Sequence, residues 1–116
     1  MKKNVLPFSP SQKQTLDSQL RFAIANKRLI RFTYESVARI AEPDDYGLRD
    51  GVPTLLAYQR QKAARRDPQV RGWRRLDVAK MQDCSVLEES FSGTRETAHQ
   101  QHHYWDVLYA RVDHMS

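Results

Sequence analysis

The chain has 116 residues, of which 40% are hydrophobic and 28% charged, and it contains a single cysteine. This length excludes large barrel enzymes and two-domain cofactor enzymes, while it leaves room for one domain with short tails. No apolar run approaches the roughly 20 residues of a membrane-spanning helix, and the basic start has no apolar stretch behind it, so we expect neither membrane contact nor secretion. A lone cysteine forms no internal disulfide, which predicts a cytoplasmic protein.

A helix is predicted over residues 10–26, after a leader at residues 1–9. Ser9 is a typical helix cap, and Pro10 is tolerated in the first helical turn. Apolar residues then recur at helical spacing, namely Leu16, Leu20, Ala23 and Ile24. This spacing gives the helix one apolar face, with which we expect it to pack on the rest of the domain.

Downstream of the helix the apolar pattern changes to alternation, which predicts about five short strands. They are expected at residues 28–35, 37–40, 54–59, 72–78 and 84–87. Glu42-Pro43 ends the second strand, residues 44–47 are a turn by composition, and Asp50-Gly51 is a tight hairpin signal. The stretch 62–69 is predicted to be an exposed loop. The predicted core consists of Leu20, Ile24, Ile30, Phe32, Leu55, Ala57, Leu76, Val78 and Val86.

One helix followed by short strands predicts a mainly β domain at residues 10–92, built as a small curled sheet or barrel. Residues 93–116 form a separate C-terminal segment. In this segment Trp105, Leu108, Tyr109 and Val112 recur at the spacing of a helix face. We therefore predict a C-terminal helix that is stably ordered by packing on the barrel, with a partner or dimer surface as the alternative.

The positive charge of the chain is concentrated in one block. Eight basic and two acidic residues lie between Arg60 and Lys80, whereas the rest of the chain carries 11 basic and 12 acidic residues. Six of the eight are arginines, whose planar guanidinium groups match phosphate geometry. With Tyr58 and Trp73 nearby, the block is predicted to face a polyanion. The alternative is a solvated loop whose basic side chains maintain solubility.

The order and spacing of several short stretches resemble the WYL domain family over about residues 18–91. The opening stretches are LRFAI at 20–24, RLIRFTY at 28–34 and RIAEP at 39–43, and LLAY at 55–58 follows Gly51. The closing stretch is LDVAKM at 76–81 with Cys84, Val86 and Phe91. The chain departs from the family in two places. It has Pro53-Thr54-Leu55 where the family carries Trp-Tyr-Leu, and Lys80 replaces the arginine of the closing Arg-Ile pair.

The resemblance implies an Sm-like or SH3-like five-stranded barrel with an N-terminal helix. It also implies a regulatory role, because such domains sense ligands, often nucleic acid or a nucleotide, for bacterial transcription regulators and phage-defence systems. The residues ahead of the first helix are too few for a helix-turn-helix domain, so we expect a stand-alone WYL-like protein. The altered Trp-Tyr-Leu motif implies that the ligand differs from that of the family or is bound weakly.

The predicted ligand-binding residues are Tyr34, Arg39, Tyr58, Arg60, Trp73, Arg75 and Lys80. The basic side chains would hold an anion, and the aromatic rings would stack on bases. On the strand at 72–78, alternation places Arg75 on the same face as Trp73 and Arg74 on the opposite face. Arg75, Lys80 and Arg39 are expected to form the anion site. The alternative function is a protein-interaction subunit that docks on a larger regulator or enzyme, or on a second copy, through the barrel and C-terminal helix.

Other constellations favour neither a metal, a cofactor nor an enzyme. His99, His102 and His103, with Asp106, have spacings that suit a metal, but a polar histidine-rich tail is the preferred interpretation. Cys84 is predicted to be a buried structural thiol. The carboxylates Glu42, Asp44, Asp45 and Asp50 are interpreted as an aspartate-rich turn rather than an acid/base pair or magnesium site. The chain has four isolated glycines and no phosphate-binding loop.

Overall fold

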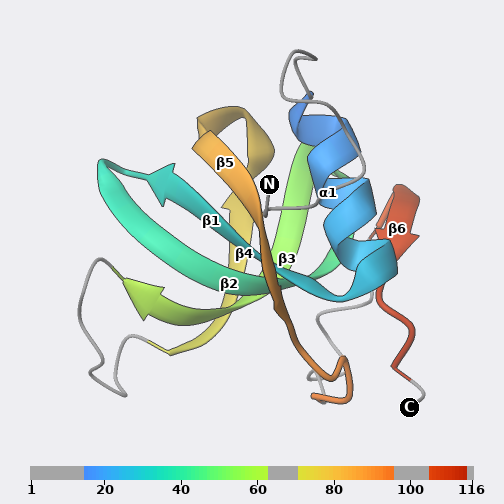
Figure 1. Cartoon of the computed structure of the whole chain (residues 1–116). Coiled ribbons are helices and arrows are strands. Elements are labelled where there is room, and N and C mark those ends of the chain that lie inside the picture. The colour runs from blue at the N-terminus through green and yellow to red at the C-terminus, as the bar shows by residue number, and fades with distance from the viewer. Residues whose placement is uncertain (1–14, 63–70, 96–104, 115–116) are drawn as a thin grey trace.

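The computed structural model describes residues 15–62, 71–95 and 105–114, and within them the protein is mainly β (Figure 1). One helix, α1 (Leu16–Asn26), precedes an antiparallel sheet of six strands. The strands are β1 (Arg28–Tyr34), β2 (Val37–Arg49), β3 (Val52–Lys62), β4 (Gly72–Asp77), β5 (Gln82–Ser90) and β6 (Val107–Arg111), and a 3-10 turn, η2 (Val78–Lys80), joins β4 to β5. The predicted leader and most of the predicted loop at 62–69 lie outside the described residues.

Helix α1 is capped at both ends by local chemistry. The Thr15 hydroxyl accepts a hydrogen bond from the backbone N–H of Ser18 at 3.0 Å, so α1 begins at Leu16. Residues 10–14 of the predicted helix lie outside the described part of the chain. The helix ends at Asn26 as predicted, because Lys27 takes a left-handed conformation with φ of 53°. The predicted apolar face is confirmed, and its residues Leu20, Ala23 and Ile24 are buried.

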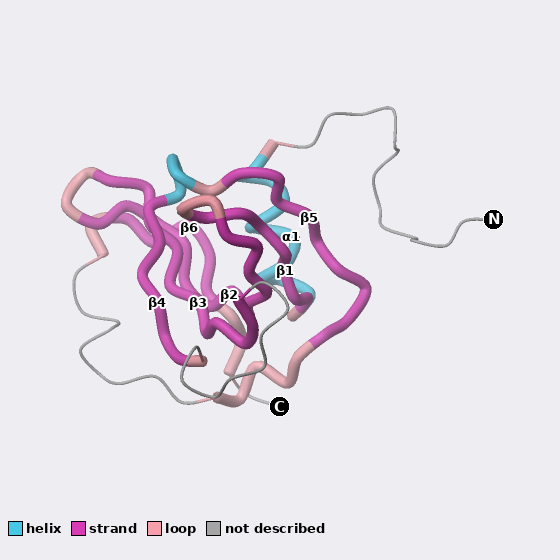
Figure 2. The backbone as a smooth tube through the Cα atoms, turned by 90° about the vertical axis from the view of Figure 1, so that its left-hand side faces the viewer, coloured by secondary structure: helices cyan, strands magenta, loops and turns pink. Residues whose placement is uncertain are grey.

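The strands follow the order β4-β3-β2-β1-β5, and the sheet is open, because β4 and β5 do not pair in the described part of the chain. A closed five-stranded barrel is therefore not confirmed. The long strand β2 pairs with β3 along one side; on its other side it pairs with β1 at 37–41 and then with β6 at 45–48. Figure 2 follows the curved strands from β4 through β3 and β2 to β1 and β5, with α1 beside the last two.

The prediction that the second strand ends at Glu42-Pro43 is wrong. Strand β2 continues through Pro43 and through residues 44–47, which were predicted to be a turn. Pro43 lies after the last residue paired with β1, Ala41, and before the first paired with β6, Asp45, where neither strand requires a backbone N–H. The strand also carries a bulge between Pro43 and Asp45.

The Asp50-Gly51 hairpin is confirmed. Both residues have positive φ, 53° and 77°, as a tight turn between antiparallel strands requires. This turn joins β2 to β3 and sets their register, in which Arg49 faces Val52.

The predicted C-terminal helix is wrong, because residues 107–111 form strand β6. The free side of β2 beyond Ala41 offers backbone groups that β6 satisfies by pairing, and this tertiary contact overrides the helical spacing of the apolar residues. The inward side chains are held by packing, with the Tyr109 ring 5.1 Å from that of Tyr46 and Val112 only 2% exposed. Residues 96–104 of the C-terminal segment lie outside the described part of the chain.

The predicted core is confirmed. Every residue of it belongs to one buried cluster, with α1 packed on β1, β2, β5 and β6. The cluster also contains five residues outside the predicted core set, namely Ala23, Ala41, Tyr46, Met81 and Val112. Cys84, which was predicted to be buried, is partly buried and packs at the edge of the cluster, where burial raises the pKa of its thiol to about 12. No helix in the described residues is long and apolar enough to cross a membrane.

Candidate anion-binding site

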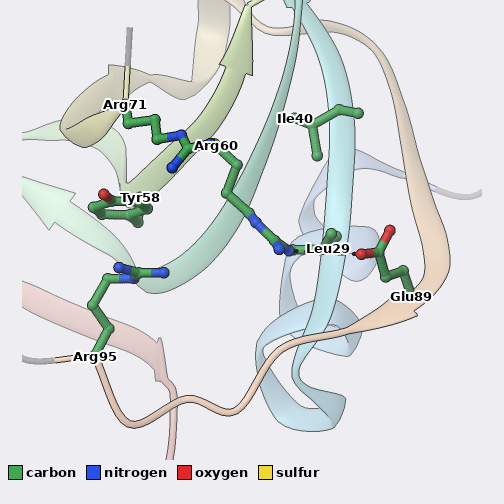
Figure 3. Close-up of a pocket in the computed structure, with 7 residues that line it drawn as sticks. All are labelled: Leu29, Ile40, Tyr58, Arg60, Arg71, Glu89 and Arg95. Carbon is green, nitrogen blue, oxygen red and sulfur yellow. Dashed lines mark ion pairs between the residues drawn. The ribbon is translucent and has the colours of Figure 1, made fainter. Parts of the chain in front are cut away.

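A pocket of about 430 Å³ lies beside the stretch of β3 that contains Tyr58 and Arg60 (Figure 3). It is lined by Leu29, Ile40, Tyr58, Arg60, Arg71, Glu89 and Arg95. The three arginines come from three separate places in the chain: from β3, from the residue before β4, and from the segment after β5. The fold thus brings three arginines and one aromatic ring to the lining of one pocket.

A row of side chains across three strands forms the base of this site. In the register of the sheet, Tyr58 on β3 faces Glu42 on β2 on one side and Trp73 on β4 on the other. The Tyr58 and Trp73 rings meet edge to face, with centroids 5.5 Å apart and an interplanar angle of 81°. Because Ala57 and Gln59 beside Tyr58 are buried, the row lies on the face of the sheet that points away from the core.

The carboxylate of Glu42 organises two of the arginines. Arg95 donates from Nε to Oε1 at 3.1 Å and from Nη2 to Oε2 at 3.0 Å, a bidentate pair. Arg60 Nε lies 3.6 Å from the same Oε2. The Glu42 side chain is only 9% exposed, whereas Arg95 and Arg60 are about half-exposed. The hydrogen bonds that Arg95 donates to Glu42 raise the pKa of Arg95, so its guanidinium stays charged.

The remaining contacts place the guanidinium groups around the pocket. The Arg95 Cζ lies 3.7 Å from the centroid of the Tyr58 ring, which is a close cation–π contact. The Arg60 side chain extends to the wall of the pocket formed by Glu89, with Nη1 3.8 Å from Glu89 Oε2. Figure 3 draws Arg71 on the other side of Tyr58 from Arg95. Arg71 is exposed, and no ion pair joins it to any of residues 15–62, 71–95 or 105–114.

Of the seven predicted ligand-binding residues, the structure brings together Tyr58, Arg60 and Trp73. Tyr34 and Arg39 are not part of this group. Arg39 is only 7% exposed, donates to Gln59 at 3.2 Å and to Glu35 at 3.3 Å, and lies over the Tyr34 ring at 5.2 Å. The Tyr34 hydroxyl accepts a hydrogen bond from the backbone N–H of Asp77 at 3.0 Å. Both side chains therefore serve the fold.

The predicted anion site of Arg39, Arg75 and Lys80 is not assembled. Arg75 is exposed on the face of β4 that Trp73 occupies, as predicted, but it lines a different, shallow pocket with Arg49, Asp50 and Asp77. Lys80 is exposed in η2, beyond the end of β4. Arg75 and Lys80 therefore do not join Arg60, Arg71 and Arg95 in the lining of the pocket at Tyr58.

Sequence reasoning missed Arg95 and Glu42 as site residues and included Arg71 only within the basic block. Arg95 lies far along the chain from Tyr58, and no motif links the two. Glu42 was assigned to an aspartate-rich turn, which the structure replaces by the continuous strand β2. The other members of that acidic group separate: Asp44 and Asp45 are buried near β6, and Asp50 lies in the hairpin turn.

No metal centre is found in the described part of the chain, where no three His, Cys, Asp or Glu side chains are close enough to hold an ion. The histidine cluster His99, His102 and His103 lies outside the described residues. At Cys84 the raised pKa leaves a neutral thiol, which is a poor nucleophile.

Comparison of the chain with protein-family models, with curated proteins and with solved structures found no match.

Proposed function

We propose that the protein is a regulatory ligand-binding module whose pocket at Tyr58 holds an anionic ligand, either single-stranded nucleic acid or a nucleotide. The observation that carries this proposal is that Arg60, Arg71 and Arg95 line one pocket together with the Tyr58 ring, which Arg95 contacts. Guanidinium groups match phosphate geometry, and aromatic rings such as Tyr58 and Trp73 are what bases stack on. The pocket volume of about 430 Å³ falls in the range of small-molecule sites.

The two acidic side chains at the site, Glu42 and Glu89, do not prevent the arginines from binding an anion. Glu42 is buried beneath the pocket and is engaged by Arg95 and Arg60, so it positions these arginines. Glu89 is exposed and lies at one wall, where its 3.8 Å contact with Arg60 is open to exchange for a ligand oxygen. Arg71 adds an exposed positive charge. An anion that enters the pocket therefore meets three cations.

A relation to the WYL family, with its Sm-like barrel and its roles in transcription regulation or phage defence, is part of the same proposal. It is supported by the element order, a helix followed by five consecutive antiparallel strands. It is also supported by the position of Tyr58, which ends the LLAY stretch of the resemblance and lines the pocket together with the three arginines.

The test is a titration of a labelled single-stranded oligonucleotide at low and high salt, with wild type, Arg71→Glu and Arg75→Glu compared. Several phosphate contacts make affinity fall steeply as salt rises. Arg71→Glu should weaken binding more than about tenfold, or ~1.4 kcal/mol, since it removes one cation of the pocket and adds a repulsive charge. Arg75→Glu makes the same change in net charge outside the pocket and should lower affinity by no more than about threefold.

Equal losses in the two variants would mean that only net charge matters, and the pocket would not be the site. No binding by wild type at low salt would refute the anion-binding function.

A second candidate function, a protein-interaction subunit, is favoured by exposed apolar side chains at the β2–β3 turn end of the sheet. Val52, Val107 and Leu108 are 42%, 46% and 39% exposed. Val107 faces Leu48 in the register of β6 with β2. Such a surface would dock through a strand rather than through the predicted C-terminal helix. Apolar docking barely responds to salt, so self-association or partner binding that persists at high salt and is lost in Val107→Ser would support this function.

A further inference from the structure

Arg95 has an unusual combination of contacts. One face of its guanidinium lies against the Tyr58 ring, with Cζ 3.7 Å from the ring centroid. Its edge donates two hydrogen bonds to the carboxylate of Glu42. The side chain is nevertheless 43% exposed, and it lines the pocket. The group is therefore fixed on one face and along one edge while part of it remains open.

A guanidinium is planar and delocalised, so both of its faces can stack on flat groups. Nucleic-acid bases use arginine planes as stacking partners as well as aromatic rings. The bidentate pair with Glu42 fixes the plane of Arg95 before a ligand arrives, which lowers the entropy cost of binding. The face of Tyr58 covered by Arg95 is not free for a base, so a base that enters from that side meets Arg95 first.

From these contacts we infer that Arg95 is the stacking surface for a nucleobase of the ligand. The base lies against the part of Arg95 that Tyr58 and Glu42 leave open, while Arg60, which lines the same pocket, holds the phosphate beside it and Arg71 supplies a further cation across Tyr58. Glu42 acts as a positioning residue that keeps the guanidinium in place. This inference rests on the proposed function and deepens it: the pocket requires a base and discriminates against a bare sugar phosphate or polyphosphate.

The experiment compares two labelled probes of equal length and charge, a single-stranded oligonucleotide and its abasic counterpart. Wild type should bind the intact probe about tenfold more tightly, since one stacked base contributes roughly 1–3 kcal/mol. Arg95→Lys keeps the charge and removes the plane, so it should lose most of this preference and keep its affinity for the abasic probe. Arg60→Lys, the matched change at an arginine assigned to phosphate, should alter both affinities by the same factor and leave the preference intact.

The inference and the proposed function fail in different ways. Equal binding of both probes by wild type would overturn base stacking and leave an anion site. A preference that survives in Arg95→Lys would overturn the role of Arg95 and place the base on another ring. No binding of either probe would overturn both proposals. The wild-type comparison needs no variant, so a folding defect in Arg95→Lys, checked by thermal unfolding, does not remove the test. Glu42→Gln then serves as the second variant and should also lower the preference.

Discussion

Arg111 forms a bidentate pair with the fully buried carboxylate of Asp45, with Nε 2.9 Å from Oδ1 and Nη2 3.0 Å from Oδ2. The hydrogen bonds that Arg111 donates to Asp45 raise the pKa of Arg111. This pair ties the end of β6 to the middle of β2, directly after the bulge. The pairing of β6 with β2 brings the Arg111 cation to this buried carboxylate. A buried charge without a partner is costly, so the ion pair stabilises the strand arrangement of the C-terminal residues.

We expect Arg111→Met to destabilise the protein by about 3 kcal/mol, because it leaves the Asp45 charge buried without its bidentate partner. This cost is at the lower end of the range for breaking a buried ion pair, because the Arg111 side chain is 38% exposed. The measurement is urea unfolding at neutral pH. Arg31→Met, the same change at an exposed arginine of β1, should stay within roughly 0.5 kcal/mol of wild type. Equal effects of the two changes would show that the pair contributes nothing specific.

Stability should depend on pH through Asp44. Burial and the neighbouring Asp45 raise the pKa of Asp44 to about 7, and His114 and Arg111 oppose the rise. The folded protein thus holds this proton more tightly than the unfolded chain does. The contribution of Asp44 to the free energy of unfolding is therefore largest below its ordinary pKa near 4, and it is lost as the pH rises to about 7.

The variant that isolates this effect is Asp44→Asn, which cannot ionise. Thermal unfolding across the range from about pH 4 to about pH 8 should show the variant gaining stability relative to wild type as the pH rises. Asp83→Asn, at an exposed position whose positive φ suits either residue, should give a curve parallel to that of wild type. A constant difference between Asp44→Asn and wild type over the whole range would contradict the raised pKa.

At Gly47 the backbone of β6 lies close to β2. A Cβ at this position would clash with the carbonyl oxygen of Val107 and lie 3.0 Å from the Cα of Leu108. Gly47→Ala should therefore push β6 away at a cost of about 1–3 kcal/mol. Amide exchange of Val107–Arg111 should accelerate more than that of β1. If β6 exchanges at the wild-type rate in Gly47→Ala, the close approach of the two strands is wrong.

Leu20 tests the packing of α1 on the sheet. Its side chain is 0% exposed, so Leu20→Ala should cost about 2–5 kcal/mol through lost burial and the cavity left behind. Ala25→Ser, on the exposed side of the same helix, should cost no more than about 0.5 kcal/mol. Urea unfolding measures both. An unchanged midpoint for Leu20→Ala would remove α1 from the core.

Local sequence patterns were sufficient to predict the elements in which buried residues recur at a regular spacing. The apolar face of α1, the alternation in β1 and the Asp50-Gly51 turn all follow from neighbouring residues. Strand β6 does not, because its partner on β2 lies about half the chain away and only that pairing selects a strand over a helix. The passage of β2 through Pro43 is equally non-local, since it depends on where β1 stops and β6 starts.

The candidate site was predictable only where its residues are close together in the sequence. Tyr58 and Arg60 are close in sequence, and the basic block with Trp73 follows them. Arg95 enters from a distant segment, held by a carboxylate that composition assigned to a turn. Arg39 was included because of its charge, but whether an arginine in a strand faces solvent or the core depends on the register and on the bulge beside Ile40, which no sequence pattern revealed.

Because Arg39 is buried and hydrogen-bonded, its substitution should lower stability and leave ligand affinity unchanged, whereas substitution of Arg71 should lower affinity. Arg39→Met removes hydrogen bonds to Gln59, which is 3% exposed, and to Glu35, and should cost about 1–3 kcal/mol of stability. It should leave affinity for single-stranded oligonucleotide within about twofold of wild type, since one lost phosphate contact would show as a larger change. The two measurements are urea unfolding and the low-salt titration, performed on the same preparation below the unfolding transition. A stable Arg39→Met protein with weakened binding would return Arg39 to the ligand site and place the anion on the core side of β2.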